Sequence, residues 1–297
     1  MTAVATRVGR APSEGHSGTV TSTGGRIGRA LINLAAALAL LYLFLPIFVI
    51  IAFSFNQPKG RFNSVWQKFT FDNWANPFSD KALTDALKLS IEVAIIATVI
   101  ATILGTFVAV ALVRYRFKGG SGVNFLLVLP LTAPEIVLGA SLLTLFLEPH
   151  LVLFNISFKL GFTTILLAHI MFCVSYVALT VKARLRGFDW TLEDAAMDLG
   201  ANPTRTFLRV TLPLIIPGIL AAFLLSFALS IDDFIITYFV SGPSTTTFPV
   251  RIFGQSRTAT PPQINVLASM ILFGSIIVLA VGTLLGQRRE RRLNKAT

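Results

Sequence analysis

Long apolar stretches alternate with shorter polar segments along most of the chain. Each stretch is long enough to cross the hydrocarbon core of a bilayer as a helix, which takes about 20 residues. The six stretches cover residues 31–55, 86–113, 123–147, 162–182, 214–240 and 265–287. We therefore predict an all-α, polytopic membrane protein with six transmembrane helices. An even number of spans places both termini on the same side of the membrane.

The polar ends of the chain differ from its middle. Residues 1–29 are rich in Gly, Ser, Thr and Arg and show no apolar period, so we predict a disordered tail. Residues 30–287 hold the spans and form the predicted membrane domain. Residues 288–297 form a short basic C-terminus.

The composition excludes a soluble domain. Of the 297 residues, 54% are apolar and only 13% are charged, and the mean hydropathy is +0.74. A soluble globule could not bury that much apolar surface, and a nucleic-acid partner is excluded despite the net charge of +11. Lys and Arg are concentrated in both termini and in the connections after the second and fourth spans. The positive-inside rule therefore places both termini in the cytoplasm, next to anionic lipid headgroups.

The longest cytoplasmic connection, residues 186–213, predicts two short helices. Thr191 is a good N-cap residue, with an imperfect capping box behind it. Gly200 suits a left-handed helix end. Asn202 and Pro203 suit the N-cap and first residue of a second helix.

The first of these helices carries a single apolar stripe with helical spacing. The stripe consists of Leu192, Ala195, Ala196 and Leu199. A shallow ridge of small residues fits a groove on another protein. The alternative, a helix lying in the headgroups, usually has Lys and Arg on its polar face. This helix instead carries acids, which favours a protein partner; they are Glu193, Asp194 and Asp198.

The same connection resembles the EAA loop of ABC importer permeases. The resemblance is carried by Asp194-Ala-Ala-x-x-x-Gly200 and, after nine intervening residues, by Val210-x-Leu212-Pro213, where Pro213 marks the turn into the fifth span. Asp194 stands where the family usually has Glu. With the spans, the resemblance covers nearly the whole chain after residue 30. It implies the type I ABC importer permease fold and a loop that docks on an ATPase. The implied contact residues are Glu193, Asp194, Ala195, Ala196, Leu199, Gly200, Leu212 and Pro213.

Further segments resemble the spermidine/putrescine permeases of the PotC/PotI type. They cover residues 109–119, 129–136, 229–236, 239–243 and 262–268. The resemblance implies a bacterial inner-membrane complex with a second, homologous permease, two cytoplasmic ATPase subunits and an extracytoplasmic binding protein. ATP and Mg²⁺ are then used by the ATPase subunits, and no cofactor is bound by this chain.

The sequence contains no motif for chemistry of its own. It lacks a P-loop, H-E-x-x-H and any Cys/His cluster with metal-ligand spacing, so we expect no catalytic residue and no metal site. Cys173 lies in an apolar run and is expected to be inert. His169 lies inside the fourth span, where a neutral ring bonded to a neighbouring helix is expected. A serine hydrolase is still an alternative function, although no G-x-S-x-G occurs.

Acidic residues inside the spans point to a substrate pathway. A charge there is costly unless it faces protein or water, which makes Glu135, Asp232 and Asp233 candidates. No intramembrane Lys or Arg neutralises them, which favours a cationic substrate; hydrogen bonds to the companion permease explain any single acid equally well. Adjacent helical residues point about 100° apart, so one aspartate can line the pathway while the other bonds a neighbouring helix. A fourth acid, Glu92, is expected to pair with Lys88 one turn away.

Two outer segments, residues 56–85 and 241–264, are rich in aromatic residues and in Gly and Pro, respectively. Aromatic residues near a membrane surface usually anchor the protein, and a substrate or partner surface is the alternative. Trp74 and Tyr238 are candidates for cation–π contact with a cationic substrate.

Together these features predict the permease subunit of an ATP-driven importer that carries polyamines by alternating access. A permease for an amino acid, an iron chelate or a sugar is the alternative within this class. A channel and an intramembrane hydrolase are the alternatives outside it.

Overall fold

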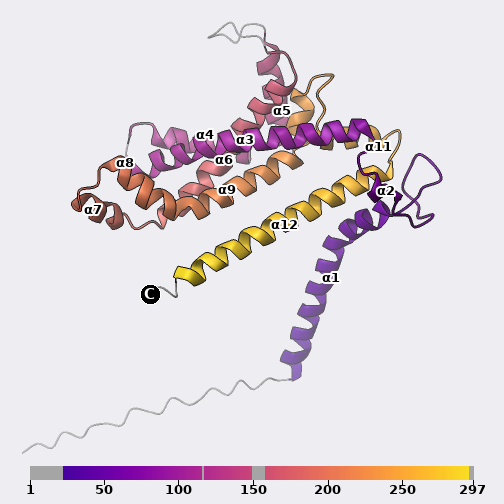
Figure 1. The fold of residues 1–297 in the computed structure, drawn as a ribbon, viewed down its shortest axis with the longest axis horizontal. Helices are drawn as coiled ribbons and strands as arrows, with labels where there is room; N and C mark the ends of the chain where they lie inside the picture. Colours follow the sequence, from indigo (N-terminus) through magenta and orange to yellow (C-terminus); the bar gives the residue numbers. More distant parts are fainter. Residues whose placement is uncertain (1–22, 116, 149–157, 294–297) are drawn as a thin grey trace, which may run out of the picture. The chain divides into compact units, whose positions relative to one another are not determined.

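The computed structural model describes residues 23–115, 117–148 and 158–293, and in this part the regular secondary structure is helical, apart from two isolated bridges. The helices are α1 (Thr23–Ser54), α2 (Asp72–Ala75), α3 (Lys81–Arg114), α4 (Gly120–Thr132), α5 (Glu135–Leu147), α6 (Phe162–Arg186), α7 (Thr191–Asp198), α8 (Pro203–Thr206), the π-helix η1 (Phe207–Thr211), α9 (Leu212–Asp232), α10 (Ile235–Val240), α11 (Phe248–Ser256) and α12 (Pro262–Leu293) (Figure 1).

The chain divides into two compact units. The first unit ends at Ala52, and the second begins at Phe53. The first unit is formed by α1, which begins at Thr23, inside the predicted tail; residues 1–22 of that tail and 294–297 of the predicted C-terminus lie outside the described residues. From Gly28 to Ser54 α1 is apolar enough to cross a membrane, with a mean hydropathy of 2.8.

The prediction of six simple spans is confirmed only in part. Among the described residues, four helices are long and apolar enough to cross a membrane, or five if one bent pair counts as a span. The four are Gly28–Ser54, Lys81–Arg114, Phe162–Arg186 and Pro203–Asp232. The predicted sixth span belongs to α12, but its apolar described part, Pro262–Ile277, is shorter than a full crossing.

The predicted third span is a bent pair of helices. The axes of α4 and α5 differ by 111°. Ala133 between them is extended, with ψ of 139°, and Pro134 has ψ of 130°. A proline disfavours helical geometry at the residue before it and lacks the N–H needed for the helical hydrogen bond. Glu135 therefore lies at the beginning of α5 and not in the middle of a continuous helix.

The predicted fifth span is also interrupted. After α9 the backbone is extended at Asp233, with ψ of 123°, and the short helix α10 begins at Ile235. The apolar pattern continues through this point and gives no sign of the break. At its other end, α9 continues from α8 through η1, so the predicted turn at Pro213 is wrong. In the π-helical turn the Leu212 N–H bonds the carbonyl of Phe207, and Pro213 follows in the first turn of α9.

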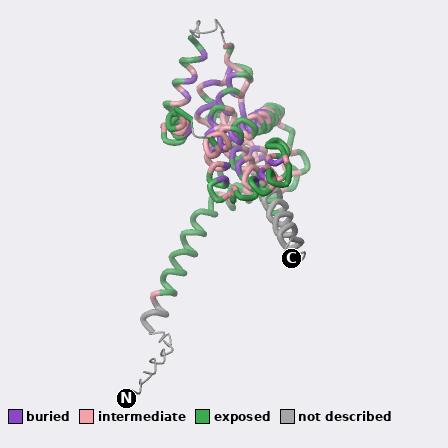
Figure 2. The backbone as a smooth tube through the Cα atoms, turned by 90° about the vertical axis from the view of Figure 1, so that its left-hand side faces the viewer, coloured by how far each residue is buried: buried purple, intermediate pink, exposed green. Residues whose placement is uncertain are grey.

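The core of the second unit lies between α3, α6 and α9, which pack side by side (Figure 1). Figure 2 shows the buried residues concentrated in this bundle. Small residues bring the helix backbones close together, as is usual between membrane helices. Ala101 and Ala178 are fully buried, and a Cβ on Gly105 would lie only 2.7 Å from Cγ1 of Val177.

The first of the two segments predicted to lie outside is organised by a buried asparagine. The amide of Asn56 donates to Oδ1 of Asn63 at 2.7 Å and to the carbonyl of Val65 at 2.9 Å. Its oxygen accepts from the backbone N–H of Gln67 at 2.8 Å. Asn63 N–H in turn donates to the carbonyl of Thr260 at 3.0 Å, so the two outer segments are joined by hydrogen bonds.

Candidate functional site

The beginning of α7 differs from the prediction by one position. Thr191 is the first residue of the helix and not its N-cap. Oδ1 of Asp189 accepts the Thr191 N–H at 3.1 Å and its hydroxyl at 2.8 Å. Asp189 therefore takes a capping role, because its carboxylate accepts the free N–H of Thr191, two residues later.

The predicted end of α7 and the start of α8 are confirmed. Gly200 has φ of +87°, the left-handed conformation that suits a glycine after a helix. The side chain of Asn202 accepts the Arg205 N–H at 2.8 Å, and Pro203 is the first helical residue. Leu212 and Pro213 lie beyond η1 at the start of α9, where both are partly buried.

One side of α7 presents small and apolar residues to the outside. Leu192, Asp194 and Ala195 are exposed, Ala196 is half-buried, and Leu199 is 91% exposed. Exposed apolar residues that are grouped on one side of a helix and bordered by acids fit a surface that another protein covers. Of the predicted docking residues between 193 and 200, Glu193 alone is buried.

Glu193 faces inward and is 3% exposed. Its Oε2 lies 2.9 Å from Nη2 of Arg114, and Oε1 accepts from Nη1 at 3.2 Å. Oε1 also accepts the hydroxyl of Thr211. Sequence reasoning missed both partners, because Arg114 is 79 residues away and stood out only as a basic residue that indicates topology.

A second buried polar cluster lies at the interruption between α9 and α10. Asp233 accepts the Thr237 N–H at 2.8 Å, its hydroxyl at 2.6 Å and the Ile236 N–H at 3.4 Å. Nδ1 of His169 on α6 lies 2.7 Å from the Ser230 hydroxyl, and Nε2 lies 2.9 Å from that of Thr237. The expectation that His169 bonds a neighbouring helix is confirmed.

The two adjacent aspartates therefore have different surroundings. The Asp233 carboxylate is 6% exposed and lies 3.5 Å from Nε2 of His169, whereas Asp232 is exposed. Of the pair, Asp233 bonds a neighbouring helix and Asp232 is free to face a pathway. Glu135 is exposed as well. Glu92 and Lys88 are also exposed, and the predicted ion pair between them is absent from this described stretch of α3.

The two interrupted spans are packed against each other through α5 and α10. Gly139, four residues into α5, lies so close to α10 that a Cβ would be 2.6 Å from Cδ2 of Phe239. The far ends of both helices meet the chain near the beginning of α6: Phe146 packs on Phe158, before this helix, and Thr164, in its first turn, donates to the carbonyl of Val240. The helices thus run in the same direction, and their first residues, beside the two interruptions, lie on the same side of the bundle.

The two aromatic candidates have different surroundings. Trp74 stacks on Phe55, with ring centroids 5.5 Å apart, and its indole N–H donates to the Ser54 hydroxyl at 2.9 Å. Its ring is thus engaged in an aromatic cluster of the outer segment. Tyr238 is exposed and contacts the rings of Phe234 and Phe253.

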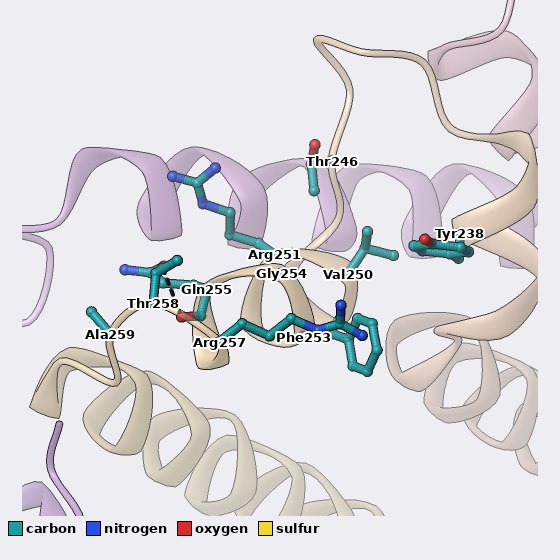
Figure 3. Close-up of a pocket in the computed structure, with 10 residues that line it drawn as sticks. All are labelled: Tyr238, Thr246, Val250, Arg251, Phe253, Gly254, Gln255, Arg257, Thr258 and Ala259. Carbon is teal, nitrogen blue, oxygen red and sulfur yellow. Dashed lines mark hydrogen bonds between the residues drawn. The ribbon is translucent and has the colours of Figure 1, made fainter.

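Tyr238 lines an open pocket of about 540 Å³ together with residues of α11 and the segment after it (Figure 3). Arg251 and Arg257 line the same pocket, and the guanidinium of Arg257 lies 5.2 Å from the centre of the Phe253 ring. Its lining residues include no acid. The pocket is therefore suited to an anionic group, and a polyamine would be repelled from it. In the described residues no cluster of His, Cys, Asp and Glu could hold a metal ion.

The chain belongs to the family of binding-protein-dependent transport system inner membrane components, whose family model matches residues 101–291. It is the permease component of an ABC importer, a transport subunit that leaves ATP hydrolysis to a partner. This assignment sets aside the channel and the intramembrane hydrolase.

Individual relatives agree with this assignment. The putrescine transport system permease protein PotI of Escherichia coli strain K12 is 40% identical over 253 residues, which cover 84% of this chain and 89% of the relative. The spermidine/putrescine transport system permease protein PotC of the same strain is 35% identical over 265 residues, covering 89% and 97%.

Solved structures support the fold. The chain is similar to a chain of a bacterial ABC transporter involved in the import of the acidic polysaccharide alginate, with a TM-score of 0.65, 15% identity and coverage of 89% and 97%. A bacterial alginate ABC transporter in complex with an alginate pentasaccharide-bound periplasmic protein gives a TM-score of 0.62, 16% identity and coverage of 88% and 95%.

Proposed function

We propose that this chain forms one half of the translocation pathway of a polyamine importer. The observation that carries the proposal is the pair of exposed carboxylates, Glu135 and Asp232, beside the interruptions of two spans packed against each other. The names of the relatives, which are putrescine and spermidine permeases, support the same substrate class.

The chemistry of the interruptions suits a substrate with several positive charges. A broken membrane helix frees backbone carbonyls, which are tolerated at membrane depth only where they face protein or a water-filled cavity. Carboxylates and carbonyls together replace the hydration that an ammonium group loses on entering the membrane. Neutral sugars gain nothing from such a site, and anions are repelled by it.

The complete importer in this proposal contains a second permease, two ATPase subunits on the cytoplasmic side and a binding protein on the other. Both termini of this chain lie in the cytoplasm of a bacterium. ATP and Mg²⁺ are bound by the ATPase subunits, which contact the exposed side of α7. ATP binding favours the outward-facing arrangement through contacts that differ between the two states, and hydrolysis restores the inward-facing one.

Stimulation of ATP hydrolysis tests the substrate class. The complex is reconstituted in lipid nanodiscs with its binding protein, and its ATPase rate is measured with putrescine, spermidine, an amino acid, an iron chelate or maltose. We expect stimulation by the polyamines alone. Stimulation by one of the other solutes, with none by either polyamine, would contradict the proposal and support the alternative permease.

A further inference from the structure

The two adjacent acids of the cytoplasmic helix α7 have different surroundings. Glu193 and Asp194 are neighbours in the first turn of α7, yet Glu193 is 3% exposed and Asp194 is exposed. Adjacent helical residues point about 100° apart, which is why one acid faces outward while the other faces the membrane domain. Glu193 therefore cannot serve as a contact for a docked ATPase in this arrangement.

Both oxygens of the buried carboxylate are engaged. Arg114 approaches it with two nitrogens, at 2.9 and 3.2 Å, in the forked geometry that makes Arg–carboxylate pairs strong and specific in direction. The hydroxyl of Thr211, which is 1% exposed, binds the same carboxylate. Buried charges are stable only when they are paired in this way.

The three residues belong to three elements. Arg114 is the last residue of α3, where a cation also complements the helix dipole. Glu193 lies on α7, and Thr211 is the last residue of η1, directly before α9. Apart from this cluster, α7 contacts mainly η1 and the short helix α8. Glu193 is thus the residue that fixes α7 to the ends of two long helices at once.

The helix that follows Thr211, α9, ends at the interruption before α10. α9 has 21 residues, which at about 1.5 Å per residue span roughly 30 Å, and it ends at Asp232. This helix packs along α3 and α6 and connects the two places directly. A displacement of α7 that is passed to Thr211 therefore reaches the interruption beside Asp232.

We propose that Glu193 is a positioning residue that transmits the movement of α7 to α3 and α9 through Arg114 and Thr211, and so couples ATP binding to the opening of the pathway. The proposal rests on the importer function assigned above. It separates the docking role of the exposed side of α7 from the transmitting role of its buried side.

A labelling experiment tests this transmission without reference to the substrate. Asp232→Cys is introduced as a reporter at the far end of α9, in a chain whose only other cysteine, Cys173, is fully buried. The rate of maleimide labelling is measured on the purified complex without nucleotide and with vanadate-trapped ATP. In the otherwise unchanged chain we expect the rate to change at least five-fold between the two states.

Two variants then remove the cluster in different ways. Glu193→Gln keeps the side-chain shape and removes the charge, and Arg114→Lys keeps the charge and removes the fork. In both we expect the nucleotide-dependent change in labelling to fall below two-fold while the ATPase subunits still co-purify. The matched control is Asp198→Asn, which removes a charge from an exposed position of the same helix and should keep the full change.

The outcomes separate this proposal from the substrate assignment. A full labelling change in both variants would show that movement passes by another route and would overturn the proposal. Failure of both variants to assemble would also overturn it, because the cluster would then serve folding alone. If the labelling behaves as expected but polyamines do not stimulate ATP hydrolysis, the coupling role stands and only the substrate class fails.

Discussion

Replacement of Asp233 by alanine, compared with the same replacement of Asp232, distinguishes an acid that stabilises the fold from one that lines the pathway. The Asp233 carboxylate holds the start of α10 through Thr237 and Ile236 and lies beside His169 of α6. Asp232, the preceding residue, is exposed. We therefore expect Asp233→Ala to reduce the stability of the protein, whereas Asp232→Ala should leave stability almost unchanged.

The magnitude follows from the bonds that are lost. Loss of a side chain that caps a helix costs about 0.5–2 kcal/mol. Leaving the buried Thr237 hydroxyl and His169 ring with fewer partners adds about 1–3 kcal/mol, although hydrogen bonds between membrane helices lie at the low end of such values. A total of about 2–4 kcal/mol lowers the melting temperature of a protein of this size by roughly 5–10 °C.

The assay is thermal denaturation of the detergent-solubilised complex, followed by fluorescence-detected size-exclusion chromatography. Asp232→Ala is the matched control, and we expect it to melt within about 2 °C of the wild type because substitutions of exposed residues usually change stability by less than 0.5 kcal/mol. Equal melting temperatures for the two variants would refute the assignment of Asp233 as the structural member of the pair.

Three further substitutions test local features of the chain. Ala196→Asp places a charge beside the exposed side of α7, so membrane levels should stay normal while co-purification of the ATPase falls at least several-fold; unchanged co-purification would remove the docking role. Gly200 has φ of +87°, so Gly200→Val should cost about 1–2 kcal/mol and reduce assembly, and a variant with wild-type melting would contradict the left-handed geometry. Gly105→Leu should lower stability by about 1–3 kcal/mol because a Cβ there meets Val177 at 2.7 Å, whereas Gly274→Leu, where nothing lies within 4 Å, is the control; similar melting of both would refute the close helix contact.

Features determined by neighbouring residues could be predicted from the sequence. The apolar stretches of α3 and α6 matched their helices, because a membrane span is recognised by length and hydropathy alone. Gly200 and Asn202 were interpreted correctly, since a left-handed helix end and an N-cap depend on one side chain each. The N-cap prediction for Thr191 was wrong because Asp189, two residues earlier, accepts the N–H and the hydroxyl of Thr191.

Features that depend on distant residues could not be predicted. The break after Asp232 lies inside an apolar run, and it exists because Asp233 binds the start of α10 and lies beside His169, which is far away in the sequence. The burial of Glu193 depends on Arg114, 79 residues before it. The sequence patterns placed Asp233 and Glu193 in the right segments but did not indicate which way these side chains face.

The central claim is that exposed carboxylates at two interrupted helices form the path of a cationic substrate. Uptake of radiolabelled putrescine into proteoliposomes that contain the complete complex tests it most directly. The double variant Glu135→Gln/Asp232→Asn should transport putrescine at least ten-fold more slowly than the wild type, with equal amounts of assembled complex. Asp85→Asn, which neutralises an exposed acid near the beginning of α3, should transport normally. Wild-type uptake by the double variant would contradict the claim.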